Sequence, residues 1–171
     1  MRSPAERRLA YQVELVRAKR LGAGITLDET WSDRLRARWP HRLNCEMSCG
    51  PGWSDIIEAV NELIDQEGVD PITFSQIKEK FGGLRQYWHG LDPVGRIDAL
   101  IDAAEEISEG MCERCGRPSK MRRSGGPGGY IHSACDDHAI RGSAIIRVKT
   151  EKIGRGVFRI RATKIEDGDD S

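Results

Sequence analysis

Apolar residues recur at helical spacing near the start of the chain. Ser3-Pro4-Ala5-Glu6 has the form of a capping box with proline at the first helical position. We therefore predict a helix over residues 4–21 that ends at Gly22, and a second basic helix over residues 28–39, because Pro40 cannot continue a helix. The apolar stripe of the first helix is formed by Leu9, Val13 and Val16.

Two later segments carry the broader apolar face of a buried helix. The first is predicted to begin at Ser54 as its cap and to stop at Gly68. The second is predicted to open at Asp92-Pro93 and to close at Gly110. Their apolar positions are Ile56, Ile57, Val60, Leu63 and Ile64 in the first, and Ile97, Leu100, Ile101, Ala104 and Ile107 in the second.

Between these helices the period of the pattern changes from that of a helix to that of a strand. Residues 72–77 alternate in side-chain type, and Leu84-Arg85-Gln86-Tyr87-Trp88 follows Gly82-Gly83. We predict two strands around a glycine turn. Residues 77–81 fit an alternative equally well, a single helical turn with a glycine cap. Near the end of the chain, 144–150 and 157–164 alternate apolar and basic residues around a Gly-Arg-Gly turn, which predicts a β-hairpin.

The motif Cys112-Glu-Arg-Cys115 is followed after nineteen residues by Cys135-Asp-Asp-His138. Two residues between ligands allow one tight turn to direct both side chains at a single ion, and thiolate ligands favour zinc. We predict a structural Zn²⁺ site made by Cys112, Cys115, Cys135 and His138. His132 and Asp136 are nearby substitutes should His138 point outward.

His41, Cys45 and Cys49 lie at i, i+4 and i+8, which on a helix would align them and suggest a second metal site. The alternative is that both cysteines are structural and buried, and Gly50-Pro51 would cut such a helix short. The sequence leaves this choice open.

These elements predict an α+β fold in which helices pack on a small antiparallel sheet, with a zinc-ribbon-like module and a C-terminal β-hairpin. The expected division is a basic helical leader at 1–42, an α+β core at 43–110, a zinc module at 111–139, a basic hairpin at 140–165 and an acidic disordered tail at 166–171.

The net charge of zero conceals strong segregation of charge. Residues 1–42 carry 10 basic and 5 acidic groups, whereas 43–77 carry 7 acidic groups and no basic ones. Residues 92–110 are acidic again, and residues 142–165 carry 7 bases and 1 acid. Either these faces neutralise one another in the fold, or they include a localised anion-binding surface.

Two groups of cations are candidates for binding nucleic acid or a protein partner. Lys78, Lys80 and Arg85 lie close to Tyr87 and Trp88, and interleaved cations and aromatic rings suit single strands. The alternative is that the aromatic residues are core and the cations a solvated rim, or that the cations contact the acidic helices. In the hairpin, i, i+2 spacing places the cations of each strand on one face, which predicts a basic ribbon formed by Arg147, Lys149, Arg159 and Arg161.

Four motifs in a fixed order resemble a family of small uncharacterised zinc-binding proteins of bacteriophages and prophages. The resemblance covers residues 49–139, and family members often have cysteine at the position of His138. It implies a phage accessory role with no established reaction. The zinc segment alone also resembles the finger of DksA/TraR-type RNA-polymerase-binding regulators. The four motifs are Gly52-Trp53, QIKEKFGGLRQY from Gln76 to Tyr87, Ala104-Glu-Glu-Ile-Ser108, and Cys112-Glu-Arg-Cys-Gly-Arg-Pro118 leading to Cys135-Asp-Asp-His138.

Enzyme motifs are not found: the sequence has no HExxH, no P-loop and no GxSxG elbow. We therefore expect a binding protein with no small-molecule substrate, engaging nucleic acid or a host nucleic-acid-handling complex. The alternatives are a protein-directed inhibitor or adaptor whose acidic stretches imitate a polyanion, and a metal-dependent nuclease. Without a membrane-spanning apolar run or a signal-peptide stretch, a location in the host bacterial cytoplasm is expected.

Overall fold

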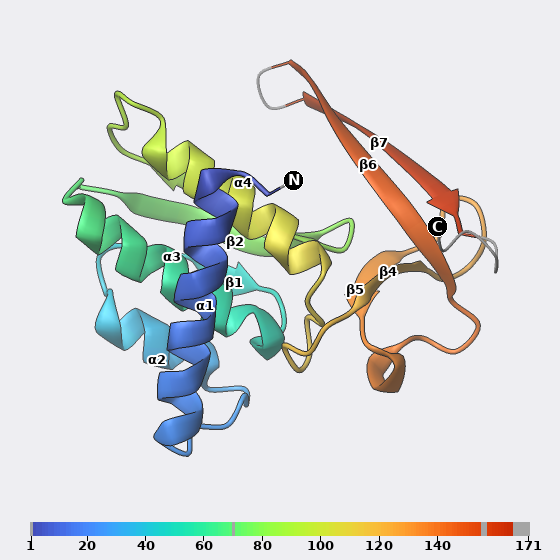
Figure 1. The fold of residues 1–171 in the computed structure, drawn as a ribbon, viewed down its shortest axis with the longest axis horizontal. Helices are drawn as coiled ribbons and strands as arrows, with labels where there is room; N and C mark the ends of the chain where they lie inside the picture. Colours follow the sequence, from blue (N-terminus) through green and yellow to red (C-terminus); the bar gives the residue numbers. More distant parts are fainter. Residues whose placement is uncertain (1, 70, 155–156, 166–171) are drawn as a thin grey trace.

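The computed structural model describes residues 2–69, 71–154 and 157–165, and its α+β class confirms the prediction (Figure 1). None of the described helices is both long and apolar enough to cross a bilayer. The helices are α1 (Pro4–Gly22), α2 (Trp31–Arg38), α3 (Ser54–Glu67) and α4 (Arg96–Glu109). The strands are β1 (Glu46–Ser48), β2 (Thr73–Lys80), β3 (Gly83–His89), β4 (Lys120–Arg123), β5 (Ile131–Ala134), β6 (Ala144–Gly154) and β7 (Val157–Lys164).

Helix α1 begins as its capping box predicts. The Glu6 N–H donates to the Ser3 hydroxyl, and the Ser3 N–H donates to the Glu6 carboxylate, both at 3.1 Å. The helix packs across α3 and α4, and α4 packs on β3. Residues of the predicted leader, including Trp31 on α2, therefore belong to the same hydrophobic cluster as α3 and α4.

Three predicted helix starts are wrong. Helix α2 begins at Trp31 and not at residue 28, because the Asp28 carboxylate accepts the Thr30 N–H at 2.9 Å in a turn before it. Ser54 is the first helical residue and not the cap, because a 3-10 turn at Pro51–Trp53 leads directly into α3. Helix α4 begins at Arg96, three residues after Pro93. The Asp92 carboxylate accepts the N–H groups of Arg96, Ile97 and Asp98 at 2.7–3.2 Å, so the residues between them form a turn. The predicted stop at Gly68 is confirmed by its left-handed φ of 63°.

The first sheet has the order β1-β2-β3. Strands β2 and β3 form an antiparallel hairpin, whereas β1 pairs parallel to β2, so this sheet is mixed. The alternative of a helical turn at residues 77–81 is wrong, because β2 continues to Lys80. The chain reverses at Phe81 and Gly82, whose φ values of 55° and 79° lie in the left-handed region.

The second sheet has the order β5-β4-β6-β7 and is antiparallel throughout. Strand β6 joins β4 through the pairs Arg122 with Ile145 and Arg123 with Ala144. Beyond this short junction, β6 and β7 form the predicted hairpin, which extends away from β4 and β5 (Figure 1). The predicted acidic tail at 166–171 lies outside the described residues.

Candidate metal centre and charged surfaces

The four predicted metal ligands converge from two turns. Cys112 and Cys115 follow α4, Cys135 follows β5, and His138 ends a 3-10 turn at Asp136–His138. Their donor atoms all lie within 4.8 Å of one another. The His138 Nδ1 atom lies 3.6 Å from Cys112 Sγ and 3.3 Å from Cys135 Sγ, and the sulfurs of Cys115 and Cys135 are 3.7 Å apart. This cluster could hold a metal ion.

Backbone hydrogen bonds form the turn that presents the first two cysteines. The Gly116 N–H donates to Cys112 O, and the Cys112 N–H donates to Arg117 O, both at 2.8 Å. Gly116 has a φ of 70°, a conformation that glycine adopts at little cost. The CxxCG sequence therefore supplies both the ligands and the residue that closes the turn.

Arg117 supplies positive charge to the ligand sulfurs. Its Nε donates to Cys115 Sγ at 3.5 Å and its Nη2 to Cys135 Sγ at 3.6 Å, and it also pairs with Asp137. Burial works to raise the pKa of Cys115, but hydrogen bonds from Arg117 and other neighbours outweigh it and lower that pKa. At Cys112 burial prevails, and it raises the pKa of the thiol.

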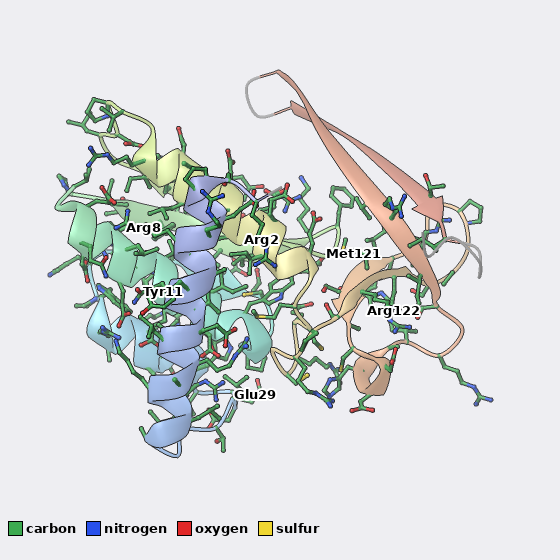
Figure 2. The ribbon with its side chains drawn as sticks, viewed as in Figure 1. Arg2, Arg8, Tyr11, Glu29, Met121 and Arg122 are labelled. Atoms are coloured by element: carbon green, nitrogen blue, oxygen red, sulfur yellow. The ribbon has the colours of Figure 1, made fainter. Side chains whose placement is uncertain are left out.

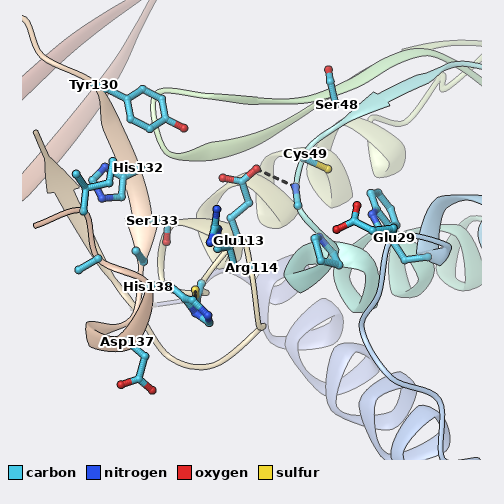
Figure 3. Close-up of a pocket in the computed structure, with 17 residues that line it drawn as sticks. Glu29, Ser48, Cys49, Glu113, Arg114, Tyr130, His132, Ser133, Asp137 and His138 are labelled. Atoms are coloured by element: carbon cyan, nitrogen blue, oxygen red, sulfur yellow. Dashed lines mark hydrogen bonds between the residues drawn. The ribbon is translucent and has the colours of Figure 1, made fainter.

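The cysteine turn is attached to the helical core by a segment that contains two glycines. The Gly52 N–H donates to Glu113 O at 2.7 Å, and the Gly50 N–H donates to the Glu113 carboxylate at 2.8 Å (Figure 3). The buried Trp53 indole donates to Met111 O at 2.9 Å. A Cβ at position 52 would lie 2.2 Å from Cys112 O, so only glycine allows this approach.

Sequence reasoning missed this attachment. The signal that could have indicated it is the pair of glycines directly before a tryptophan, since glycine often marks a place where another backbone comes close. The two segments are about sixty residues apart in the chain, and no local pattern names the partner.

The proposed second metal site is not formed. Strand β1 separates Cys45 from Cys49, so the helical spacing that would align them is absent, and His41 is exposed. Among the residues that the structure describes, the one group of three or more close metal-binding side chains is Cys112, Cys115, Cys135 and His138. The two residues suggested as substitute ligands are not part of the cluster. His132 stacks on Tyr130, and Asp136 pairs with Arg122.

The acidic face of α3 is neutralised by cations from the leader. Asp55 accepts from Arg20 Nε at 2.7 Å and from Nη2 at 2.9 Å, and only 1% of its side chain is exposed. Arg8 on α1 pairs with Glu67 (Figure 2). Further pairs are Arg17 with Asp55, Lys19 and Arg38 with Glu62, Arg38 with Glu58, and Arg42 with Asp65. The basic leader and the acidic helix α3 therefore neutralise each other, as one of the two interpretations of the charge segregation predicts.

Lys78 and Lys80 have aromatic neighbours and no carboxylate partner among the described residues. The Lys78 Nζ atom lies 5.2 Å from the ring centre of Tyr87, and the Lys80 Nζ atom lies 5.5 Å from that of Phe81. Both rings are more than 40% exposed. Arg85 is different, because it forms a 2.7 Å ion pair with Glu105 of α4 and is largely buried.

The hairpin cations lie on paired strands, with Lys149 opposite Arg161 in the register of β6 and β7. Arg147 is exposed. The side chains of Lys149, Arg159 and Arg161 lie outside the described part, so the basic ribbon stays a prediction.

Comparisons with protein-family models, with curated proteins and with solved structures found no match. The case for a function therefore rests on the residues and their geometry.

Proposed function

We propose that this protein binds single-stranded nucleic acid through β2, β3 and the hairpin, and that a structural zinc ion holds the module between them. The observation that carries the proposal is the distribution of unpaired cations. In the helical core, arginines and lysines pair with carboxylates, apart from Arg2 and Arg7 among the described residues. Cations without a carboxylate partner are concentrated in β2 and beyond residue 110: Lys78, Lys80, Arg114, Lys120, Arg123, Arg141 and Arg147.

Zinc fits the donor set and its spacing. A tetrahedron with Zn–S of about 2.3 Å and Zn–N of about 2.0–2.1 Å has S···S edges of about 3.8 Å and S···N edges of about 3.5 Å. Three of the six edges lie close to these values, with 3.7 Å between the sulfurs of Cys115 and Cys135 and 3.3 and 3.6 Å from His138 Nδ1 to the sulfurs of Cys135 and Cys112, and every donor atom lies within 4.8 Å of the others. Four protein ligands close the coordination sphere, which supports a structural role for the ion.

The exposed aromatic rings favour single strands over a duplex. Phe81 and Tyr87 each present a ring with a lysine ammonium close to it. Unstacked bases can stack on such rings while the lysines contact the adjoining phosphates, and a base on an aromatic ring contributes about 1–3 kcal/mol. In a duplex the bases stack on each other and are not available for this contact.

The competing functions receive less support. A polyanion mimic needs free carboxylates; those of α3 are paired with leader cations, which leaves this alternative the unpaired carboxylates of α4. A metal-dependent nuclease needs an ion with an open position, and the described residues offer the one closed cluster. The resemblance of residues 49–139 to phage and prophage zinc proteins supports an accessory role in a phage-infected cytoplasm.

A mobility-shift series with single-stranded and duplex oligonucleotides at rising salt tests the proposal. We expect tighter binding to single strands, with an affinity that falls as salt rises. Replacing both Lys78 and Lys80 with alanine should weaken binding and reduce the salt slope by about 0.7 for each phosphate that the variant no longer neutralises. Lys19→Ala is the matched control, because Lys19 is exposed but already pairs with Glu62.

Tyr87→Leu sharpens the test, since it removes the aromatic face and keeps both lysines. It should lower affinity for single strands and leave the salt slope unchanged. Equal binding by all variants, or no shift with any oligonucleotide at low salt, would contradict the proposed function.

A further inference from the structure

A cleft of about 800 Å³ lies between the helical core and the metal module (Figure 3). Two sheet edges contribute to it: β1 is the outer strand of the first sheet and supplies Ser48, and β5 is the outer strand of the second and supplies Ser133. An outer strand has one row of backbone groups that its own sheet does not pair. The Ser133 carbonyl of β5 already accepts the Glu113 N–H at 3.3 Å, so β1 is the edge that an extended chain in the cleft can join.

The charge around the cleft is negative. Glu29 and Glu113 line it and form no ion pair among the described residues, and Arg114 is a single cation beside them. Asp137 also lines the cleft but pairs with Arg117. The carboxylate of Glu113 has a fixed position, because it accepts the Gly50 N–H at 2.8 Å.

Tyr130 lies close enough to carboxylates for their negative charge to change its pKa. Burial and the carboxylates of Glu79 and Glu113 raise the pKa of Tyr130 to about 12. The ring is 52% exposed and stacks on His132 with centroids 5.4 Å apart and planes within 5°. The outer face of this aromatic pair is open to a cation.

His132 contributes unused hydrogen-bonding capacity. Its side chain lines the cleft and is only 5% exposed, and no side chain among the described residues pairs with its buried ring nitrogens. Buried polar groups almost always have partners, so an unpartnered buried imidazole points to a ligand. Burial lowers the pKa of His132, which favours the neutral ring with one nitrogen free to accept a hydrogen bond.

We infer that this cleft binds an arginine side chain carried by an extended, basic segment of a partner protein. A guanidinium suits the site better than an ammonium. It is planar and can stack on the outer face of Tyr130, and its fork of donors suits the Glu113 carboxylate. The flanking backbone would add to the free edge of β1. This interaction is separate from the proposed nucleic-acid binding, which uses surfaces of opposite charge.

The test is an NMR titration of the full-length, zinc-loaded protein with the peptide Gly-Thr-Arg-Val-Gly, blocked at both ends. We expect shifts of the His132 ring and of the Ser48 or Ser133 amide. The peptides with lysine or glutamate in place of arginine should bind at least tenfold more weakly. Glu113→Gln should weaken binding about tenfold, because it removes the charge but keeps an oxygen for the Gly50 N–H. Glu14→Gln, at an exposed carboxylate on α1, is the control and should have no effect.

Three results would overturn the inference. The first is equal binding of the glutamate and arginine peptides, the second is binding of argininamide alone as tight as that of the peptide, and the third is a shift of His132 by a mononucleotide in place of the peptide. The two proposals fail separately: the Lys78 and Lys80 variant should keep peptide binding while losing nucleic acid, and Glu113→Gln should do the reverse.

Discussion

The helical core and the metal module are stabilised in different ways. Apolar side chains from α1 to α4 and from the first sheet form one buried cluster that runs from Leu9 to Met111. The buried set of the module and its junction with β6 is small and mixes apolar side chains with polar ones. It comprises Cys112, Met121, Arg122, His132, Ser133, Ala134, Cys135 and Ile146 among the described residues.

This contrast indicates what a metal ion bound at the cluster would contribute. Burial of apolar area stabilises the core at about 25 cal/mol per Å², and the module has too little apolar area to rely on that term. Its turns are instead brought together by four ligands and anchored to the core by hydrogen bonds from Gly50, Gly52 and Trp53. The core should therefore survive changes that unfold the module, and four predictions test this.

The largest effect is expected on loss of the ion. Chelation or Cys135→Ser should unfold the module and leave the core helices intact, because zinc binding in small modules is worth on the order of 10 kcal/mol. Hydrogen exchange should show fast amides in β4 and β5 and slow ones in α3. Cys45→Ser, outside the cluster, is the control. Protected β4 and β5 amides in the metal-free protein would refute the contrast.

A substitution inside the core should act in the opposite way. Arg20→Ala leaves the buried carboxylate of Asp55 without its two close hydrogen bonds, and breaking such a pair costs about 3–5 kcal/mol. Urea unfolding followed by helix signal measures the loss. Arg34→Ala removes an arginine from a more exposed pair with Asp28 and should cost less than about 1 kcal/mol. Similar losses in both variants would show that the Asp55 pair is not special.

The attachment between the regions should be sensitive to one methyl group. Gly52→Ala places a Cβ against Cys112 O and should destabilise the protein by about 1–3 kcal/mol, since backbone must shift to admit it. Gly22→Ala, where a Cβ meets nothing within 4 Å, is the matched control and should be neutral or stabilising. If the two variants unfold alike, the glycine contact does not join the regions.

A smaller effect concerns pH at the same junction. Burial, helped by Glu106 and Glu105, raises the pKa of Glu109 from 4.5 to about 7 in the folded protein. Folding therefore favours the protonated form, and this group's contribution to stability is lost as pH rises from about 4.5 to about 7.

In the Glu109→Gln variant the free energy of unfolding should fall by about 1 kcal/mol less over this pH range than in the unchanged protein. This figure is reduced for the partial solvation of the group. Unfolding of both proteins in zinc-saturated buffer from pH 5 to 8 measures the difference, and metal binding to the thiolates affects both alike. Parallel pH profiles would contradict the assignment to Glu109.

Local patterns predicted the parts of the structure that depend on neighbours in the chain. The capping box at Ser3 and Glu6, the apolar face of α3 and the two ligand pairs of the metal cluster each have their signal within a few residues. The wrong helix start at Ser54 has a tertiary cause. Trp53 is held by Met111 O, so α3 emerges from the turn that contains Trp53.

Partners distant in sequence could not be predicted. The charge of residues 43–77 suggested an acidic surface, but the pairing of Arg20 with Asp55 depends on how α1 crosses α3. The cleft with Tyr130 and His132 likewise exists because the metal module lies against the core. Composition reports how many charges a segment has, and packing decides which of them remain free.

The short pairing between β4 and β6 joins the hairpin of β6 and β7 to the metal module at one end only. At about 3.3 Å per residue, the eleven residues of β6 span about 36 Å. A small rotation at the pairing of β4 with β6 would therefore move the far end of the hairpin by a much larger distance. Since β4 lies in the chain between the two pairs of candidate ligands, an ion bound by them would fix the strand from which the hairpin extends.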